Sequence, residues 1–194
     1  MHAKQGHVGA VNLQQSVSRI IAALNEAGLD YMLVGSFSSM YYSFPRSTTD
    51  ADFVIGTADF DIQSLSNSLG SEFKFDPQLS FETIGGSIKN EIQIVGSPFR
   101  IELFRLTDQA FDQVRFERRQ KVTIAGDEVW IPTPEDVILQ KLIWSRPQDK
   151  NDVLGVIAVN YQELDQRYLQ EWAEKLGLAE EFTSAWALAI ESVK

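Results

Sequence analysis

Two aspartates separated by a single residue are the side chains of this sequence best placed to do chemistry. Asp50 and Asp52 stand at the head of an apolar stretch, Ala51 to Ile55, which is expected to form a strand. Side chains two apart on a strand share a face, so both carboxylates should project side by side. Two such carboxylates repel each other when both are ionised, and a divalent cation relieves that repulsion. Because Mg²⁺ is commonly held by one or two carboxylates together with substrate phosphates, the pair predicts a magnesium site.

A short segment upstream predicts a phosphate cradle. Gly35 and Ser36 follow Tyr31 to Val34, an apolar run of strand length, and precede an expected helix over 37–44. A glycine lets the backbone approach a ligand closely. Ser36 offers a hydroxyl and an N–H at the start of a helix, which is a geometry suited to an anion. The sequence therefore places a phosphate cradle ahead of a metal-binding carboxylate pair.

Composition bounds the class of protein. The chain has 194 residues, with 44% hydrophobic and 23% charged residues, as in a globular protein of one domain or of one domain with a helical extension. There is no cysteine, which excludes disulfides, thiolate metal sites and cysteine catalysis. The net charge of −10 argues against a grip on long nucleic acid through many phosphates. A basic run can be either a solvated helix end or a local basic patch, and it comprises Arg115, Arg118, Arg119 and Lys121.

The start of the chain carries no predicted function. Residues 1–12 are expected to be disordered, and the mixed, polar beginning does not look like a secretory signal. The two histidines, His2 and His7, lie there, so histidine catalysis is not expected. No apolar run approaches the roughly 20 residues of a membrane span. A cytoplasmic location fits these features.

The order of elements predicts an α+β core followed by helices only. Thr133 and Pro134 form a good helix start, so the boundary is expected between residues 132 and 133, with the core in 1–132 and a helical region in 133–194. The pattern predicts strands over 31–34, 51–55, 73–75, 81–84, 91–95, 100–106, 121–124 and 128–131, the last two joined as a hairpin. It predicts helices around 17–24 and over 37–44, 60–69, 107–118, 150–160, 164–176 and 179–193, with one more starting at 134.

This order of motifs resembles the nucleotidyltransferase superfamily that shares its palm with DNA polymerase β. The family pattern is a strand, Gly-Gly or Gly-Ser, a short helix and then Asp-x-Asp, and the intervening length here is the expected one. The resemblance implies a mixed β-sheet flanked by helices. A third carboxylate normally comes from a later neighbouring strand, within an apolar–acid–apolar pattern. Glu102 fits this pattern, while Glu91 and Glu82 are weaker candidates.

A narrower resemblance is to the small bacterial nucleotidyltransferases that include abortive-infection toxins and type IV toxin–antitoxin toxins. These tend to show Arg-x-Ser/Thr-x-Asp-x-Asp, which the segment from Arg46 to Asp52 matches. They also carry a downstream helix with a lysine, then an arginine and two spaced aspartates. Here these are Lys141, Arg146, Asp149 and Asp152. The resemblance runs from about residue 31 to residue 156 and does not cover the last helices.

The resemblance implies transfer of a nucleoside monophosphate from a nucleoside triphosphate to a hydroxyl or similar acceptor. It implies two divalent ions, Mg²⁺ or Mn²⁺. The acceptor is left open among transfer RNA, protein and small molecules, and an antitoxin partner is implied but no membrane. The catalytic and metal-binding residues would be Asp50, Asp52 and Glu102. The nucleotide-binding residues would be Gly35, Ser36, Arg46, Thr48 and Lys141.

Three alternatives stand beside this interpretation. The chain could be a catalytically silent nucleotide-binding protein of the same fold, a partner bound by an antitoxin, or an acidic α+β protein whose Asp-x-Asp is structural. Individual residues also have structural explanations. Glu102 could be a surface acid on an edge strand, Lys141 a solvated helix residue, and Asp149 and Asp152 ordinary helix-start residues.

Overall fold

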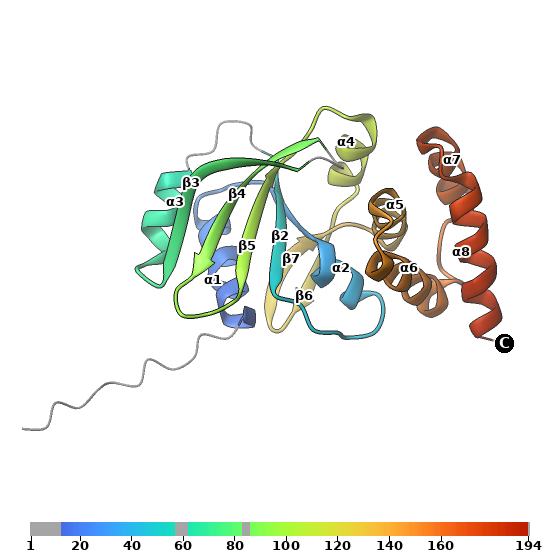
Figure 1. Ribbon diagram of the computed structural model, residues 1–194, viewed down its shortest axis with the longest axis horizontal. Coiled ribbons are helices and arrows are strands. Elements are labelled where there is room, and N and C mark those ends of the chain that lie inside the picture. Colours follow the sequence, from blue (N-terminus) through green and yellow to red (C-terminus); the bar gives the residue numbers. More distant parts are fainter. Residues whose placement is uncertain (1–12, 57–61, 83–85, 194) are drawn as a thin grey trace, which may run out of the picture.

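The core of the protein is a five-stranded mixed sheet with strand order β1-β2-β5-β4-β3 (Figure 1). The computed structural model describes residues 13–56, 62–82 and 86–193, so the expectations for residues 1–12 lie outside the described residues. Strands β2 and β5 are parallel neighbours, and the other pairs are antiparallel. The strands are β1 (Tyr31–Val34), β2 (Asp50–Ile55), β3 (Phe73–Glu82), β4 (Ser87–Ile94) and β5 (Arg100–Arg105), with a separate hairpin of β6 (Gln120–Ile124) and β7 (Asp127–Ile131).

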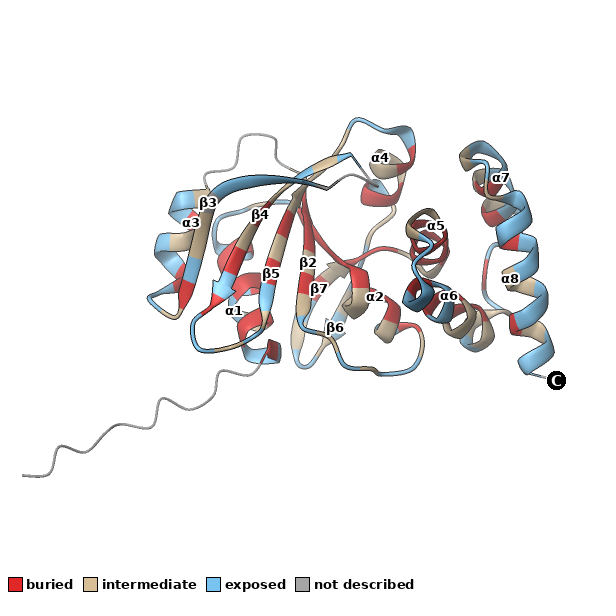
Figure 2. Cartoon of the chain, viewed as in Figure 1, coloured by how far each residue is buried: buried red, intermediate tan, exposed pale blue. Residues whose placement is uncertain are grey.

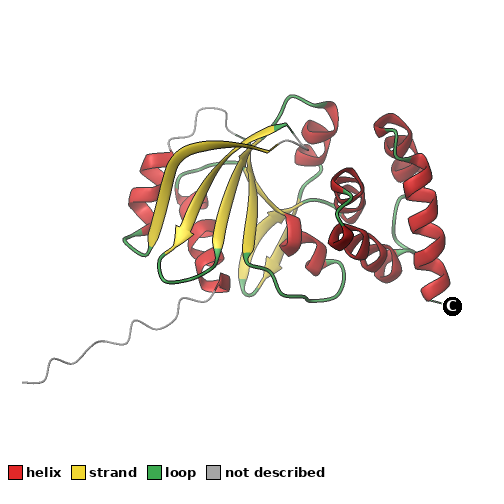
Figure 3. Cartoon of the chain, viewed as in Figure 1, coloured by secondary structure: helices red, strands yellow, loops and turns green. Residues whose placement is uncertain are grey.

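Helices alternate with the strands at first and then follow alone. Figure 3 shows the last four helices gathered at one end of the molecule, beyond α2. A mixed sheet flanked by helices and followed by a helical extension confirms the expected fold class, whereas the division at residue 132 stays a prediction. The helices among the strands are α1 (Leu13–Glu26), α2 (Gly35–Tyr41), α3 (Ile62–Leu69) and α4 (Ala110–Glu117). The later helices are α5 (Pro134–Trp144), α6 (Pro147–Asn160), α7 (Gln166–Leu176) and α8 (Ala179–Ser192).

The two faces of the sheet differ because side chains alternate along each strand. On β2, Ala51 and Phe53 point into the main hydrophobic core, together with side chains of α1 and α3. Asp50 and Asp52 point to the opposite face, where they are only partly buried. Figure 2 shows this alternation as buried and intermediate residues along the central strands. The strand pattern read from the sequence therefore puts both carboxylates on one face.

Strands β3 and β4 correct three predicted strands, those over 73–75, 81–84 and 91–95. Strand β3 runs without a break from Phe73 to Glu82, although the sequence indicated two short strands separated by polar residues. A register shift between Asp76 and Ser80 absorbs the interruption, and pairing with β4 continues on both sides of it. Strand β4 likewise starts at Ser87 instead of Glu91. Pairing of β3 with β4, and of β4 with β5 as well, satisfies much of the backbone of these polar stretches, which hydropathy alone does not predict.

The predicted hairpin is confirmed, and its turn explains its sequence. Ala125 and Gly126 form the two-residue loop between β6 and β7, with φ angles of 54° and 97°. Two positive φ angles in a two-residue loop suit the right-handed twist of the flanking strands. The hairpin packs beside β1 through β7, whose Val129 and Ile131 are fully buried in the core.

The basic run from the last turn of α4 to the start of β6 is neither a solvated helix end nor a free basic patch. Arg115 is buried and pairs with Asp112 at 2.8 Å. Arg118 lies 3.2 Å from Asp136 in the first turn of α5, and its guanidinium carbon lies 3.9 Å from the centroid of the Tyr168 ring. The two remaining members are also paired, Arg119 with Asp30 at 2.8 Å and Lys121 with Glu128 at 2.9 Å. These side chains join elements of the fold, so a nucleic-acid surface cannot be built from them without breaking ion pairs.

None of the described helices has the length and apolar character that crossing a lipid bilayer requires.

The core beneath the carboxylates should be the least tolerant part of the sheet. Ile101 on β5 is fully buried next to Glu102, so Ile101→Ala should lower the free energy of unfolding by about 2–5 kcal/mol. Ile88 on β4 is 41% exposed, and Ile88→Ala should change it by no more than about 0.5 kcal/mol. Urea denaturation of the two variants measures the difference. Ile88 and Ile101 lie on the same face of the sheet and differ in burial, so equal effects would contradict that difference in burial.

Candidate active site

A cavity of about 710 Å³ lies over the face of the sheet that carries the carboxylates. Its size is typical of pockets for small molecules. Side chains of β2, β4, β5, α2, the segment before β2 and the turn between α5 and α6 line it. Six of the eight predicted site residues are among them, namely Ser36, Arg46, Thr48, Asp50, Asp52 and Glu102.

Strand register brings the acidic side chains into one row. Asp52 is the direct neighbour of Glu102 across the parallel pair, and Glu102 is the direct neighbour of Glu91 across the antiparallel pair. All three therefore share one face of the sheet. Glu102 lines the cavity from a central strand, so it is not a surface acid on an edge strand. Glu91 stands one strand further out, and the side chain of Glu82 lies outside the described residues.

Gly35 lies directly against the Asp52 side chain, at a position where no larger residue fits. It is the first residue of α2, directly after β1, and has a φ angle of +66°. A Cβ at this position would overlap a carboxylate oxygen of Asp52. Glycine adopts positive φ at little cost, whereas other residues are strained there. Gly35 thus permits the close contact of the Asp52 carboxylate with the chain that enters α2.

The Asp52 carboxyl is the strongly perturbed acid of the site. Burial, and then the negative charges of Glu102 and Asp50, raise its pKa from 3.8 to about 7. The positive charges of Lys141 and Lys89 oppose this rise but do not cancel it. The raised pKa means that the positive charges near Asp52 do not balance the negative charges of the two other acids and the cost of burial. A bound cation would supply that charge.

Two basic side chains already hold the other two carboxylates. The Lys89 ammonium lies 2.6 Å from Glu102, and the Arg100 guanidinium lies 3.2 Å from Asp50. Within the ranges 13–56, 62–82 and 86–193, no three acidic or histidine side chains form a group that could hold a metal ion as they stand. The donors are nevertheless the hard oxygen ligands that Mg²⁺ prefers. The residues therefore fit a divalent cation by their chemistry, and the basic partners of Glu102 and Asp50 must move to admit it.

A second cluster of charges lies at one wall of the cavity, which Arg146 and Asp149 line, with Lys141 and Asp152 behind them. Lys141 lies 2.9 Å from Asp149 and 2.8 Å from Asp152, and its side chain is only 3% exposed. Burial acts to raise the pKa of both aspartates, but hydrogen bonds and charges from Lys141, Arg146 and Arg46 hold it below the ordinary value. Lys141 is thus not a solvated helix residue. It does not line the cavity, so its contact with a nucleotide stays a prediction.

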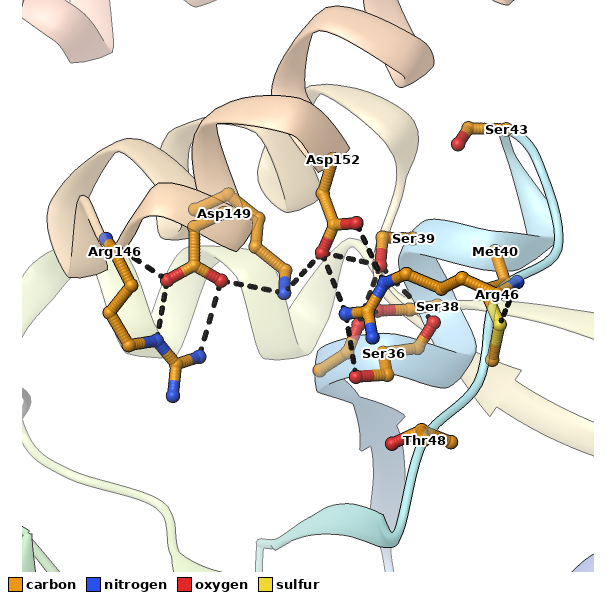
Figure 4. Close-up of polar contacts among 12 residues, drawn as sticks. Ser36, Ser38, Ser39, Met40, Ser43, Arg46, Thr48, Arg146, Asp149 and Asp152 are labelled. Carbon is orange, nitrogen blue, oxygen red and sulfur yellow. Dashed lines mark hydrogen bonds and ion pairs between the residues drawn. The ribbon is translucent and has the colours of Figure 1, made fainter.

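Arg46 links this cluster to the cavity. Its guanidinium donates to both oxygens of Asp152, at 2.9 and 3.0 Å. One of the same nitrogens donates to the Ser36 hydroxyl at 2.8 Å. Figure 4 shows Arg46 lying between Asp152 and Ser36. Thr48 has a different task, since its hydroxyl contacts the backbone N–H and C=O of Asp50 and so fixes the start of β2.

Sequence reasoning missed several residues of the site. Lys89, Arg100 and Trp144 line the cavity, yet no motif singles them out. The position of Lys89 and Arg100 beside acidic residues on neighbouring strands becomes meaningful only once the register is known, and Trp144 enters the cavity from the end of α5. Asp149 and Asp152 carried a usable signal, because residues three apart on a helix share a face and both could meet one buried lysine.

Comparison with known protein families identifies one matching family. The sequence model of a family described as "Nucleotidyltransferase of unknown function (DUF6036)" matches residues 11–189. No curated protein matches the chain in sequence. These findings confirm the predicted superfamily, while the narrower resemblance to toxins stays a prediction.

Solved structures show the same fold. An antigenic nucleotidyltransferase-like protein from Paracoccidioides brasiliensis has 19% identity and a TM-score of 0.56, over 90% of this chain and 92% of its own. The antibiotic-resistance factor ANT(2'')-Ia has 13% identity and a TM-score of 0.56, over 94% of this chain and 98% of its own. The protein JHP933 from Helicobacter pylori has 14% identity and a TM-score of 0.52, over 98% of this chain and 82% of its own. At such identities the likeness concerns the fold alone.

The raised pKa of Asp52 predicts how stability depends on pH without metal. The folded protein keeps the Asp52 proton up to about pH 7, whereas an ordinary aspartate loses it near 3.8. The free energy of unfolding should therefore fall as pH rises through this window, by at most about 4 kcal/mol from this group. Asp52→Asn should remove that part of the fall and be the more stable protein at about pH 8. Urea denaturation with a chelator checks this, and an identical pH dependence of both proteins would contradict it.

The contact at Gly35 predicts a second effect. Gly35→Ala should lower the free energy of unfolding by more than the roughly 1–2 kcal/mol of a left-handed alanine, because the new Cβ also displaces the Asp52 carboxylate. Gly177→Ala is the matched control, since Gly177 has a φ angle of +72° but open space around its Cα. Thermal or urea unfolding measures both variants. A loss at Gly35 no larger than the loss at Gly177 would show that the contact is unimportant.

Proposed function

The chain belongs to this nucleotidyltransferase family, and we propose that it transfers a nucleoside monophosphate from a nucleoside triphosphate to a hydroxyl or similar acceptor, with divalent metal ions. One observation carries the proposal. The Asp52 carboxylate lies against Gly35 at the entry to α2, and it stands in register with Glu102 on the parallel neighbour strand. A place for phosphate and a set of acidic ligands therefore meet in one cavity.

The phosphate side of the proposed site is formed by α2 and the segment before β2. Ser36 offers its hydroxyl to the β- and γ-phosphates, and Arg46 adds a planar cation that suits phosphate oxygens. Lys141 contributes positive charge from behind the wall, where its distance to the Asp52 carboxylate is short enough to lower the pKa of that group. These groups bind and orient the triphosphate so that its α-phosphorus faces the carboxylates.

The acidic side of the proposed site would hold Mg²⁺ or Mn²⁺ through Asp50, Asp52 and Glu102. Two such ions, when bound, stabilise the charge on the attacking and leaving oxygens. Glu102 takes the proton of the acceptor hydroxyl, directly or through water. The acceptor oxygen then forms a bond to the α-phosphorus as the bond to pyrophosphate breaks, and pyrophosphate leaves with its electron pair.

A toxin is the narrower form of this proposal. The residues that carry the resemblance to toxins are far apart in sequence, yet Arg46, Lys141, Asp149 and Asp152 meet in one network. These contacts support a common role for the residues that match the toxin pattern. In this form the acceptor is a transfer RNA or a protein of the cell, and an antitoxin is the expected partner.

The second candidate is a silent nucleotide-binding protein of the same fold. The observation that favours it is the Lys89–Glu102 ion pair at 2.6 Å, which keeps the third carboxylate occupied. If Lys89 stays in place when nucleotide binds, Glu102 cannot serve an acceptor. Nucleotide would then bind through Ser36 and Arg46 without turnover.

Glu102→Gln separates the two candidates. In an enzyme it should reduce transfer by about 10²-fold or more, because Glu102 acts mainly as charge develops in the transition state. It should leave nucleotide affinity within a few-fold of the original. Titration calorimetry measures binding of the four nucleoside triphosphates with Mg²⁺. Radiolabel transfer to transfer RNA, protein, small molecules and the chain itself measures turnover.

Glu91→Gln is the matched comparison, since it makes the same change in the next acid of the row. It should reduce transfer much less than Glu102→Gln. If Glu91→Gln abolishes transfer and Glu102→Gln spares it, Glu91 is the third carboxylate. If the original protein binds nucleotide but labels no acceptor, the silent protein is the better description.

A further inference from the structure

Asp152 on α6 is a buried aspartate whose oxygens are shared among four donors. Its Oδ1 accepts from Arg46 Nε at 2.9 Å. Its Oδ2 accepts from Arg46 at 3.0 Å and from the Ser39 hydroxyl at 3.2 Å, and it lies 2.8 Å from the Lys141 ammonium. A carboxylate whose two oxygens both accept hydrogen bonds in this way holds its partners in fixed directions. Asp152 itself does not line the cavity.

The partner that matters for the cavity is Arg46. Its side chain is 23% exposed and lines the cavity, while its guanidinium is gripped by both oxygens of Asp152. The nitrogen that contacts Asp152 Oδ2 also donates to the Ser36 hydroxyl at 2.8 Å. A planar guanidinium held by two parallel bonds cannot rotate freely. Its contact with Ser36 is therefore fixed by Asp152.

Arg46 needs such an anchor because its own backbone gives little support. It lies in the stretch between α2 and β2, where no helix or strand is formed. A long side chain in such a segment samples many rotamers and loses considerable entropy when it is fixed. The anchor comes from α6, 106 residues later in the chain. Helix α6 thus holds Arg46, on the proposed phosphate side of the cavity, through this carboxylate.

We propose that Asp152 is a positioning residue of the nucleotide site, which holds Arg46 and, through it, the Ser36 hydroxyl in the orientation that receives a triphosphate. The inference rests on the proposed function, because it concerns the same site. It assigns Asp152 no contact with substrate. It also gives Lys141 a structural role, because its ion pairs with Asp149 and Asp152 hold the Asp152 carboxylate in place.

Electrostatics and positioning make opposite predictions for Asp152→Asn. The change removes one negative charge near the proposed phosphate site, so Coulomb attraction alone should tighten binding of an anion. If Asp152 acts by positioning, binding should weaken despite the more favourable charge. Weaker binding of the anion would therefore have no simple electrostatic explanation. The sign of the change in affinity distinguishes the positioning role from a purely electrostatic one.

The experiment is titration calorimetry with Mg²⁺-tripolyphosphate and with the four Mg²⁺-nucleoside triphosphates. Asp152→Asn should weaken binding of tripolyphosphate by about tenfold, the effect of freeing one long side chain at a binding site. Arg46→Lys, which keeps the charge but loses the forked grip, should weaken it similarly. The double variant should be no weaker than Arg46→Lys alone, because Asp152 acts through Arg46.

Asp149→Asn is the matched control. It removes a buried carboxylate from the same helix and the same lysine. Unlike Asp152 it lines the cavity, but it has no hydrogen bond or ion pair with Arg46 or Ser36. Its effect on binding should add to that of Arg46→Lys, whereas the effect of Asp152→Asn should not. Thermal unfolding of every variant separates loss of fold from loss of binding. If Asp152→Asn does not fold, Arg46→Lys with the original affinity for tripolyphosphate would overturn the inference.

The outcomes separate this inference from the function on which it rests. Unchanged or tighter binding of tripolyphosphate by folded Asp152→Asn overturns the positioning role and leaves the proposed transferase intact. Additive effects of Asp152→Asn and Arg46→Lys overturn it as well. Failure of the original protein to bind tripolyphosphate and all four nucleotides overturns the proposed function, and the positioning role with it.

Discussion

The contact between the Asp52 carboxylate and Gly35 is the constraint on which the rest of the site depends. It requires α2 to begin at the residue after β1, and it requires β1 to pair with β2 so that Val34 stands opposite Asp52. It also requires a residue without a Cβ and with positive φ at position 35. Once these conditions hold, the phosphate side and the acidic side of the cavity cannot be far apart.

Charge balance is the second consequence of this arrangement. Asp52, Glu102 and Asp50 face one cavity, and burial together with the charges of the other two acids makes the ionisation of Asp52 more costly. Basic side chains on two sides of the acids offset part of this cost. Lys89 and Arg100 come from the neighbouring strands and pair with the outer acids, while the positive charge of Lys141 acts from behind. Asp52 itself has no direct ion pair among the described residues, so burial and the neighbouring acids keep its pKa high.

The C-terminal helices are part of this balance and do more than cover the sheet. The first turn of α5 is held by Arg118, whose ion pair with Asp136 joins it to the end of α4. Its last turns carry Lys141 and Trp144, one behind the cavity and one in its wall. Helix α6 then supplies Asp152 to Arg46. These helices are therefore coupled to the rest of the fold by ion pairs whose aspartates are buried, and loss of the arginine would leave an unpaired buried charge.

Local sequence determined much of this protein. The alternation around Asp50 and Asp52 fixed a strand with both carboxylates on one face, and Ala125-Gly126 fixed the hairpin turn. Thr133 and Pro134 fixed the start of α5, where the Thr133 hydroxyl accepts from the Asp136 N–H as an N-cap should. The order of the motifs was enough to indicate the superfamily and the fold class. These features depend on residues close together in the chain, so the sequence contains them directly.

Only the tertiary structure decided which distant residues meet. Glu102 and Glu91 have similar surroundings in sequence, and the pairing of β5 with β2 is what places Glu102 beside Asp52. Arg46 and Asp152 are 106 residues apart, and their pairing follows from the packing of α2 against α6. The burial of Lys141 has the same origin. Strand register and helix packing set these contacts through many weak interactions spread over the chain, and no short stretch of sequence carries that information.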